Sequence, residues 1–340
     1  MDRGTCEINR REISDTPNKN HITGKAREVV EEMERSIDGE GVYRMLGVFP
    51  NSSVLLYGKP GTGKSLAMKV LNNSLNEDSY LEEREVEVGE RIPTMVNEGV
   101  RLESLEREEE NEEGGPETEI VTQRIGANFH VIPYNIGDVG SAYMNMNARK
   151  MADFFRHAYQ LAEEGQKVLL EFDEVDSLLA QVKGTQGTSE DRKVRNTLRK
   201  HIQKAHDKRG VFMAFLSNEP EVCDAASFRS QRVDEKYEFK LPGKEERIEM
   251  LQVAVGKIHE RAGYEVIGEC DYERLADMSD GMSYADIDCA VEKAVRARAD
   301  ELLAQGGQDI VDPGSIGGER IERQLALLKR QNLDEGIGLN

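Results

Sequence analysis

Two short stretches of this sequence carry residues whose types and spacing suit phosphate chemistry. The first, GKPGTGKS at residues 58–65, satisfies the pattern G-x-x-x-x-G-K-[ST]. Its glycines let backbone N–H groups surround phosphate oxygens at the start of a helix. Lys64 is expected to reach the β- and γ-phosphates, and Ser65 to coordinate Mg²⁺. An apolar run precedes the stretch and a helical pattern follows it, so a chance glycine-rich turn is a poor explanation.

The second stretch, LLEFDE at residues 169–174, ends an apolar run with two carboxylates. Asp173 is expected to hold Mg²⁺ through water, since an acid at the end of a neighbouring strand can reach the metal. Glu174 is expected to polarise the attacking water, because hydrolysis needs a base beside the γ-phosphate. Taken alone, the two acids also fit a solvated cap on the next helix. Glu171 places a charge in a run expected to be buried, which is costly unless paired.

A third apolar run, VFMAFLSN at residues 211–218, ends in Asn218. A polar side chain at this strand end can orient the lytic water, although asparagine at such a position is more often a turn residue. Apolar runs and helical spacings alternate along the chain up to residue 240, and only helical patterns follow. Such alternation predicts an α/β fold: a P-loop NTPase parallel sheet with crossover helices, followed by a small all-helical lid domain.

The composition bounds the class of protein. With 340 residues, a hydrophobic share of 38% and a charged share of 32%, the chain reads as globular with a solvated or disordered segment. No apolar run approaches the ~18 residues of a membrane span, and the N-terminus lacks the apolar core of a secretory signal. The cysteines are scattered and read as reduced thiols: Cys6, Cys223, Cys270 and Cys289. We therefore expect a cytoplasmic protein without a membrane partner.

The net charge of −20 is opposite in sign to that of a phosphate-tracking protein. Most of it is local, because residues 77–119 hold 17 acidic and 4 basic side chains. We interpret this segment as a solvated, partly disordered insertion. A docking surface for a partner is the alternative.

The order of these motifs resembles the AAA clade of AAA+ ATPases over most of residues 25–300. YRMLGVFPNSSVLLYGKPGTGKS is similar to the family's entry segment and Walker A motif, LLEFDEVDSLLA to Walker B, and SNEP to sensor 1. DAASFRSQRVD at 224–234 follows the register of D-P-A-x-x-R-P-G-R-F-D. GMSYADI at 281–287 is similar to G-x-S-G-A-D-[IL] in the lid, with Tyr284 in place of the usual glycine. Ala254 stands where many members carry a histidine near the ribose.

The resemblance implies a homo-oligomeric ring, usually a hexamer, that binds ATP and Mg²⁺ at each subunit boundary. Arg229 and Arg232 fall at the arginine-finger positions, where an arginine acts in trans on the neighbour's γ-phosphate. Taken singly, each arginine is more often a surface cation or part of a local ion pair, and the register favours the finger role here. The implied catalytic residues are Lys64, Glu174, Asn218, Arg229 and Arg232. The implied nucleotide-binding residues are Gly58, Pro60, Gly61, Thr62, Gly63, Lys64, Ser65, Leu66, Asp173 and Ala285, and Ser65 and Asp173 are also the metal ligands. Ser283 is expected both to lie near the nucleotide and to cap the next helix, because S-x-x-D is a capping box and the two roles are compatible.

The resemblance also implies a domain division. We expect a flexible N-terminal arm at residues 1–24 and a large α/β ATPase subdomain at 25–240, with the acidic insertion at about 76–124. A helical lid subdomain and C-terminal helix are expected at 241–340.

The stretch SAYMNMN at residues 141–147 falls where the family carries a loop that points into the ring pore. Tyr143 and Met144 then take the positions of the aromatic and aliphatic residues that grip substrate. An ordinary exposed tyrosine is the alternative.

The implied function is an ATP-hydrolysing ring that threads a polypeptide substrate through its pore and so remodels or unfolds it. An adaptor is expected to act through the N-terminal arm or the acidic insertion. The alternative is a nucleotide-dependent switch or assembly scaffold without threading, for instance a loader on nucleic acid. The negative charge argues against the nucleic-acid version, and the full set of hydrolysis motifs argues for turnover.

Overall fold

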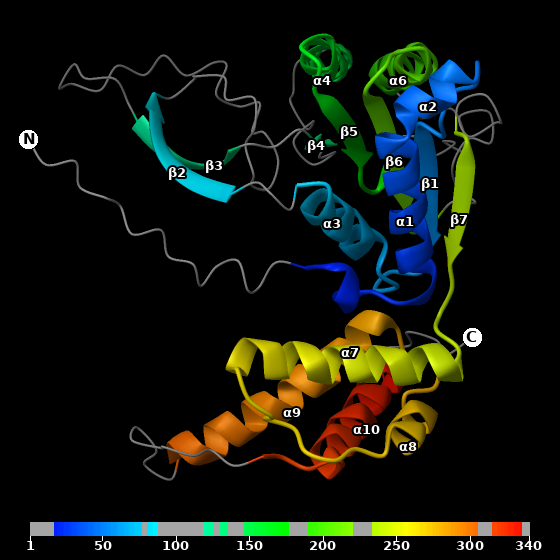
Figure 1. Cartoon of the computed structure of the whole chain (residues 1–340). Helices are drawn as coiled ribbons and strands as arrows, with labels where there is room; N and C mark the ends of the chain where they lie inside the picture. Colours follow the sequence, from blue (N-terminus) through cyan, green and yellow to red (C-terminus); the bar gives the residue numbers. More distant parts are fainter. Residues whose placement is uncertain are drawn as a thin grey trace, which may run out of the picture. The chain divides into compact units, whose positions relative to one another are not determined.

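The computed structural model describes eight segments of the chain (Figure 1), which are residues 17–76, 80–87, 118–125, 129–134, 146–176, 189–219, 233–304 and 315–334. These segments form two compact units. The sheet unit comprises the described parts of 29–58 and 71–238, and the lid unit those of 1–28, 59–70 and 239–340.

The sheet unit is built on a five-stranded parallel sheet in the order β4-β5-β6-β1-β7 (Figure 1). Its strands are β4 (Phe129–Tyr134), β5 (Lys167–Phe172), β6 (Val211–Ser217), β1 (Ser53–Gly58) and β7 (Glu235–Phe239). All seven residues of β6 are buried, as expected for a central strand of a parallel sheet. The order confirms the predicted α/β fold. The edge strand β7 was not predicted, because its sequence EKYEF is short and charged.

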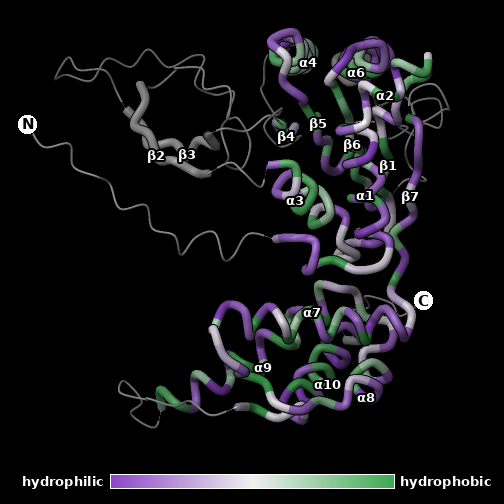
Figure 2. Tube along the Cα trace, viewed as in Figure 1, coloured by the Kyte–Doolittle hydropathy of each residue, from purple (hydrophilic) through white to green (hydrophobic). Residues whose placement is uncertain are grey.

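Helices α4 (Met146–Glu163) and α6 (Ser189–His206) provide the crossovers that return the chain to parallel strands. Helix α4 buries Met151, Phe155 and Ala158, which share one face at helical spacing. Both helices alternate hydrophobic and hydrophilic positions along their length (Figure 2). At the end of β5, Phe172 is fully buried and stacks on Phe215 of β6, with ring centroids 5.1 Å apart. This packing fixes the strand end from which the acidic pair Asp173–Glu174 emerges.

Three further helices lie wholly or partly in the sheet unit: α1 (Gly24–Asp38), α2 (Glu40–Met45) and α3 (Lys64–Ser74). Glu40 opens α2 with its carboxylate buried, and it accepts hydrogen bonds from Arg44 Nε at 2.9 Å and from the Gly210 backbone N–H at 3.1 Å. Gly210 has φ +75°, and a Cβ there would lie 2.9 Å from the Gln166 carbonyl oxygen. The turn after α6 therefore requires glycine.

Part of the acidic insertion is ordered as a separate two-stranded antiparallel sheet. Strand β2 (Tyr80–Glu87) pairs with β3 (Thr118–Ile125), with Tyr80 opposite Ile125 and Glu87 opposite Thr118. The acidic composition favoured a partly disordered segment, and no strand was predicted here. The alternation in REVEV at 84–88 is a strand signal that the many glutamates mask.

The lid unit has its own core beneath four helices: α7 (Lys244–Ala262), α8 (Tyr272–Met278), α9 (Tyr284–Ala304) and α10 (Gly318–Asp334). All four lie in the part of the chain after residue 240, where the sequence shows only helical patterns. A short 3-10 turn, η2 (Lys19–His21), belongs to the same unit. Arg247 is 6% exposed and donates to the carbonyls of Ala276 and Pro242, each at 2.9 Å. Arg247 thereby joins α7 to the end of α8.

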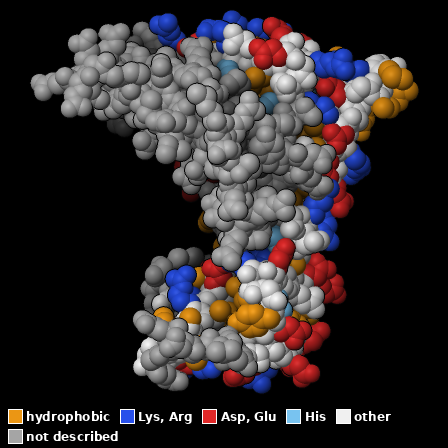
Figure 3. All heavy atoms as spheres, turned by 60° about the vertical axis from the view of Figure 1, so that its left-hand side comes forward, with side chains coloured by type: hydrophobic (Ala, Val, Ile, Leu, Met, Phe, Trp, Pro, Cys, Tyr) orange, Lys and Arg blue, Asp and Glu red, His pale blue; other side chains and the backbone are white. Residues whose placement is uncertain are grey.

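None of the helices in the described part of the chain has the length and apolarity that a bilayer crossing requires. On the face shown in Figure 3, acidic and basic side chains are interspersed over the described surface, and hydrophobic side chains gather at its upper right corner.

An ionic network joins the end of helix α6 to the starts of strands β1 and β7. Asp234 accepts hydrogen bonds from the backbone N–H groups of Ser52 at 2.8 Å and Ser53 at 2.9 Å, and it pairs with His206 Nε2 at 2.8 Å. Burial alone would raise the pKa of Asp234, but the His206 and serine hydrogen bonds together lower it. The hydrogen bond to Asp234 raises the pKa of His206 above its ordinary value of 6.5.

This network predicts a pH dependence of stability. Because the pKa of His206 is raised on folding, its contribution is complete below 6.5 and is lost as the pH rises through the folded value. The lowered pKa of Asp234 gives a contribution that is present above 3.8 and lost as the pH falls through its folded value. We expect the free energy of unfolding, measured by urea denaturation, to fall as the pH rises above about 6.5, and His206→Asn to remove that fall.

His201 supplies the control for this prediction. Its pKa is lowered, first by burial and then by the charges of Lys204, Lys200 and Arg156. His201→Asn should therefore leave the fall above about pH 6.5 in place. An equal fall in the His206→Asn protein would contradict the assignment to the Asp234 network.

Candidate functional site

The phosphate-binding motif forms the turn between β1 and α3. Gly58 ends β1, and Gly61 and Gly63 have φ +74° and +97°, values that side chains disfavour. Thr62 is buried and donates from Oγ1 to the Lys59 carbonyl at 2.8 Å. This internal hydrogen bond stabilises the turn, and the backbone of the turn can adopt the curvature of an anion-binding loop.

The residues after the turn open helix α3. Lys64 is 7% exposed, and its Nζ donates to the Lys59 carbonyl at 2.9 Å. Ser65 is exposed in the first helical turn, Leu66 is half-buried, and Pro60 is exposed in the preceding loop. The ammonium group thus folds back over the loop whose backbone is suited to phosphate oxygens.

The first turn of the lid helix α9 touches the phosphate-binding loop within the lid unit. The Ala285 backbone N–H donates to the Gly61 carbonyl at 3.1 Å. A Cβ at Gly61 would lie 2.7 Å from Ser283 Oγ and 3.2 Å from Ala285 Cβ, so this approach requires glycine. The predicted capping box is confirmed, because Asp286 accepts from the Ser283 N–H at 2.9 Å and donates its own N–H to Ser283 Oγ at 3.3 Å. Both expected features of Ser283, the cap and nearness to the loop, are present.

The acidic pair follows β5 in the sheet unit. Asp173 and Glu174 are both exposed, and Asp173 Oδ1 accepts the Glu174 backbone N–H at 2.8 Å. Glu174 has φ +48°, the left-handed conformation that non-glycine residues adopt at a cost of about 1–3 kcal/mol. Such strain is concentrated at functional sites, so the outlier supports a chemical role for this carboxylate. The sequence suggested that Glu171 places its charge in a buried run. In the structure Glu171 is only half-buried.

Asn218 follows β6, the neighbour of β5, and is exposed. Its backbone N–H donates to Asp176 Oδ1 at 3.3 Å. This contact joins the segment after β6 to the segment after Asp173 and Glu174, so the structure brings three of the predicted residues to one edge of the sheet. Asp176 was not predicted, and nothing in its sequence context marks it. The loop at Gly61 continues from β1, the strand on the other side of β6.

Four predicted residues lie outside the described part of the chain. They are the arginine-finger candidates Arg229 and Arg232 and the pore-loop candidates Tyr143 and Met144.

The residues present fit the ligand that the motif implies. Positive-φ glycines, a helix start at Lys64 and a buried ammonium group suit a triphosphate. Ser65 and Asp173 offer the oxygen ligands that Mg²⁺ prefers, and Mg²⁺ commonly takes its remaining ligands from phosphate and water. Among the described residues no group of three His, Cys, Asp or Glu side chains could hold a metal ion.

Comparison with known proteins agrees with this site. Residues 118–241 match the family described as "ATPase family associated with various cellular activities (AAA)". The chain is 27% identical over 313 residues to the 26S proteasome subunit RPT4 of Saccharomyces cerevisiae, covering 91% of this chain and 55% of the relative. It is 26% identical over 295 residues to the proteasome-activating nucleotidase of Methanothermobacter thermautotrophicus, covering 85% and 57%. The Cell division cycle protein 48 homolog of Archaeoglobus fulgidus is 24% identical over 267 residues, covering 78% and 28%.

The chain therefore spans little more than half the length of these two proteasome relatives. The family match, the relatives and the five-stranded sheet with its phosphate-binding loop agree with one another. Over residues 118–241 the chain is similar to the AAA family of ATPases, and over most of its length it is similar to the proteasome ATPases named above.

Proposed function

We propose that the chain binds ATP with Mg²⁺ and hydrolyses the β–γ phosphoanhydride. The observation that carries this proposal is the contact between the phosphate-binding loop and the lid helix α9. The Ala285 backbone N–H donates to the Gly61 carbonyl at 3.1 Å. Lys64 neutralises phosphate charge, Ser65 and Asp173 hold the metal, and Glu174 polarises the attacking water with Asn218 beside it. The other residues that form the nucleotide site in this proposal are Gly58, Pro60, Thr62, Gly63 and Leu66.

We infer that the active form is a ring of identical subunits, with a hexamer as the expected size. The relatives named as proteasome subunits and a proteasome-activating nucleotidase support an assembled ATPase. Arg229 and Arg232 act in trans on the neighbour's nucleotide in this scheme. Exposed apolar residues support a protein interface. They cluster in α2 and the segment after it: Val42, Tyr43, Met45, Leu46, Val48 and Phe49, with Met45 86% and Leu46 76% exposed.

The double substitution Met45→Glu and Leu46→Glu tests this interface. Two charges placed in a contact between copies should shift the protein to a smaller assembly and lower the ATPase rate by about tenfold or more, because the finger would no longer reach the neighbour. Light scattering after gel filtration measures the assembly. Leu303→Glu, at a residue that is also 64% exposed, should change neither property. A full-size assembly of the double variant would remove α2 from the interface.

We propose further that the ring acts by threading a polypeptide substrate, with Tyr143 and Met144 gripping it. Tyr143→Ala is expected to retain basal ATP hydrolysis within about twofold and to lose unfolding of a tagged fluorescent substrate, since an aromatic ring supplies most of the sequence-tolerant contact. Tyr264→Ala, at an exposed tyrosine of the lid unit, is the matched control. If Tyr143→Ala still unfolds the substrate, threading by this loop is wrong.

The division into an arm at 1–24, an ATPase subdomain at 25–240 and a lid at 241–340 remains a proposal, as does a cytoplasmic location. The β2–β3 sheet gives the acidic insertion an ordered element on which an adaptor can bind. The nucleotide-dependent switch without threading predicts ATP binding with no substrate unfolding. The tagged-substrate assay therefore separates the two functions.

A further inference from the structure

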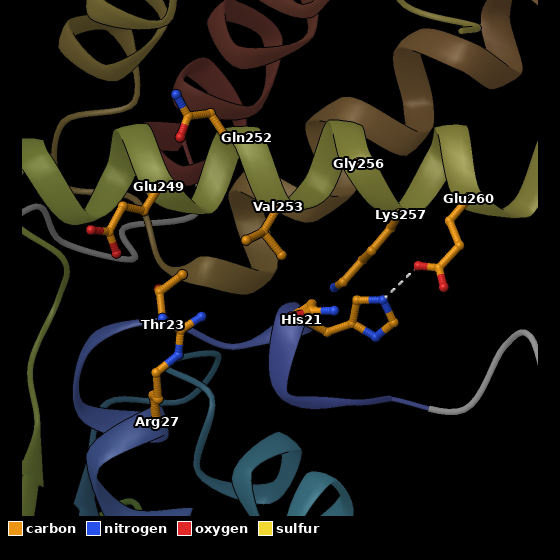
Figure 4. A pocket seen from close by; sticks show the side chains of 10 residues that line it. His21, Thr23, Arg27, Glu249, Gln252, Val253, Gly256, Lys257 and Glu260 are labelled. Carbon is orange, nitrogen blue, oxygen red and sulfur yellow. Dashed lines mark hydrogen bonds and ion pairs between the residues drawn. The ribbon is translucent and has the colours of Figure 1, made fainter. Parts of the chain in front are cut away.

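A cavity of about 450 Å³ separates the N-terminal turn at residues 18–23 from one face of α7 within the lid unit (Figure 4). His21 and Thr23 line the cavity on the side of the turn, and Val253 and Lys257 line it on the side of α7. Such a space removes dispersion contacts that close packing would supply. The attachment of the turn to the lid helices therefore depends strongly on polar contacts at the edges of the cavity.

His21 supplies two of these polar contacts. Its ring Nδ1 accepts the Asn18 backbone N–H at 3.1 Å, so Nε2 is the nitrogen that donates to the Glu260 carboxylate of α7, also at 3.1 Å. Figure 4 shows the ring reaching from the turn to Glu260. The His21 backbone carbonyl accepts a hydrogen bond from the Tyr284 hydroxyl of α9 at 3.1 Å. The turn is therefore joined to α7 by a side chain and to α9 by its backbone.

Tyr284 is the residue at which the turn, α7 and α9 meet. Its side chain is 8% exposed, and Lys257 Nζ of α7 donates to its hydroxyl at 2.5 Å. Burial, with a smaller contribution from the charge of Asp288, raises the pKa of Tyr284, so the phenol keeps the proton that it donates to His21. Lys257 also pairs with Asp288, one turn further along α9, at 3.2 Å. The first turn of α9 is thus bonded to α7 and to the N-terminal turn together.

The same turn of α9 contacts the phosphate-binding loop. The residues on either side of Tyr284 both reach Gly61. The Ala285 backbone N–H donates to the Gly61 carbonyl at 3.1 Å, and a Cβ at Gly61 would lie 2.7 Å from Ser283 Oγ. A displacement of the start of α9 would therefore displace Gly61, whose φ of +74° forms part of the curvature of the loop.

We propose that Tyr284 is a positioning residue for the phosphate-binding loop, which it holds, through the start of α9, in the curvature that binds a triphosphate. The inference rests on the proposed function. The lid motif that GMSYADI resembles has glycine at this position, and glycine has no side chain with which to bond Lys257 or His21. Tyr284 acts here on the population of the binding-competent loop, and the apparent affinity for a ligand falls with the fraction of molecules that are competent.

ATP and inorganic tripolyphosphate, each with Mg²⁺, test this proposal in the intact chain, because tripolyphosphate carries no base. Tyr284→Phe keeps the ring and removes both hydrogen bonds of the hydroxyl. We expect the Kd of both ligands to rise by the same factor, roughly three- to tenfold, the effect of a hydrogen bond lost from the support of the loop. The kcat at saturating ATP should stay within about twofold. Competition with a fluorescent nucleotide measures both dissociation constants.

Tyr272→Phe removes a half-buried hydroxyl elsewhere in the lid unit and should leave both dissociation constants unchanged. Lys257→Met is a second variant, which removes one bond of the Tyr284 hydroxyl and should also weaken both ligands. Unchanged affinities in Tyr284→Phe would overturn the proposal whatever its unfolding temperature, and a loss confined to ATP would assign Tyr284 to the base instead of the loop. Failure of tripolyphosphate to compete for the wild-type protein would equally overturn it. Tight ATP binding by Lys64→Ala would instead contradict the nucleotide site itself.

Discussion

Glu174→Gln is expected to bind ATP with unchanged affinity and to hydrolyse it about 10²- to 10⁴-fold more slowly, the usual contribution of a positioned general base. The amide matches the carboxylate in shape, so the backbone at φ +48° and the N–H bond to Asp173 at 2.8 Å are retained. Only the ability to accept a proton from water is lost. A phosphate-release assay under saturating ATP measures the rate, and equilibrium titration of a fluorescent ATP analogue measures the affinity.

Glu164→Gln is the control, because this glutamate is exposed at the end of α4 and lies outside the proposed site. It should hydrolyse ATP at the wild-type rate. Thermal unfolding of Glu174→Gln should match the wild type, since the backbone strain does not depend on the acid. Turnover by Glu174→Gln at the wild-type rate would mean that another group activates the water, and Asp176 is then a candidate through its contact with Asn218 at 3.3 Å.

Lys64→Ala is expected to weaken ATP binding by at least about 100-fold, as loss of hydrogen bonds from a charged group costs about 1.5–3 kcal/mol each. Hydrolysis at ordinary ATP concentrations should become undetectable. The physical reason is that Lys64 supplies a buried ammonium group, 7% exposed, at the start of the helix that follows the loop. Isothermal titration with ATP and Mg²⁺ measures the loss directly.

Lys69→Ala is the matched control, because it removes one positive charge from an exposed position of the same helix, α3. It should retain wild-type binding. Since Lys64 also donates to the Lys59 carbonyl at 2.9 Å, the unfolding temperature of Lys64→Ala must be measured with its affinity. Tight ATP binding by a folded Lys64→Ala protein would contradict the proposed phosphate site.

Much of the fold could be predicted from the sequence, because the signals for these elements lie within a few neighbouring residues. The loop at residues 58–65 is a contiguous motif, and its glycines take the positive φ values that the motif demands. Strand β6 is an unbroken apolar run, and helix α9 begins at the residue after its capping serine, Ser283. Interactions between residues three or four apart depend on the chain's own geometry, so pattern and spacing were sufficient to predict them.

Pairings between distant segments depended on the tertiary structure. Strand β3 pairs with β2 across a long acidic segment, and the charges of both strands conceal their alternation. The bond from Tyr284 to the His21 carbonyl joins residues 263 positions apart, and the His206–Asp234 pair joins a helix end to an edge strand that was not predicted. Each of these residues has several possible partners in the sequence, and only the packing of the complete chain selects one.

The sequence by itself therefore determined the phosphate-binding loop, the acidic strand end and the lid helices, since each lies within a few consecutive residues. Only the tertiary structure decided that Ala285 binds the Gly61 carbonyl, that Asp176 meets Asn218, and that a cavity forms between His21 and Lys257. Those contacts arise where separate elements are brought together by burial of their apolar faces, which is a property of the whole fold.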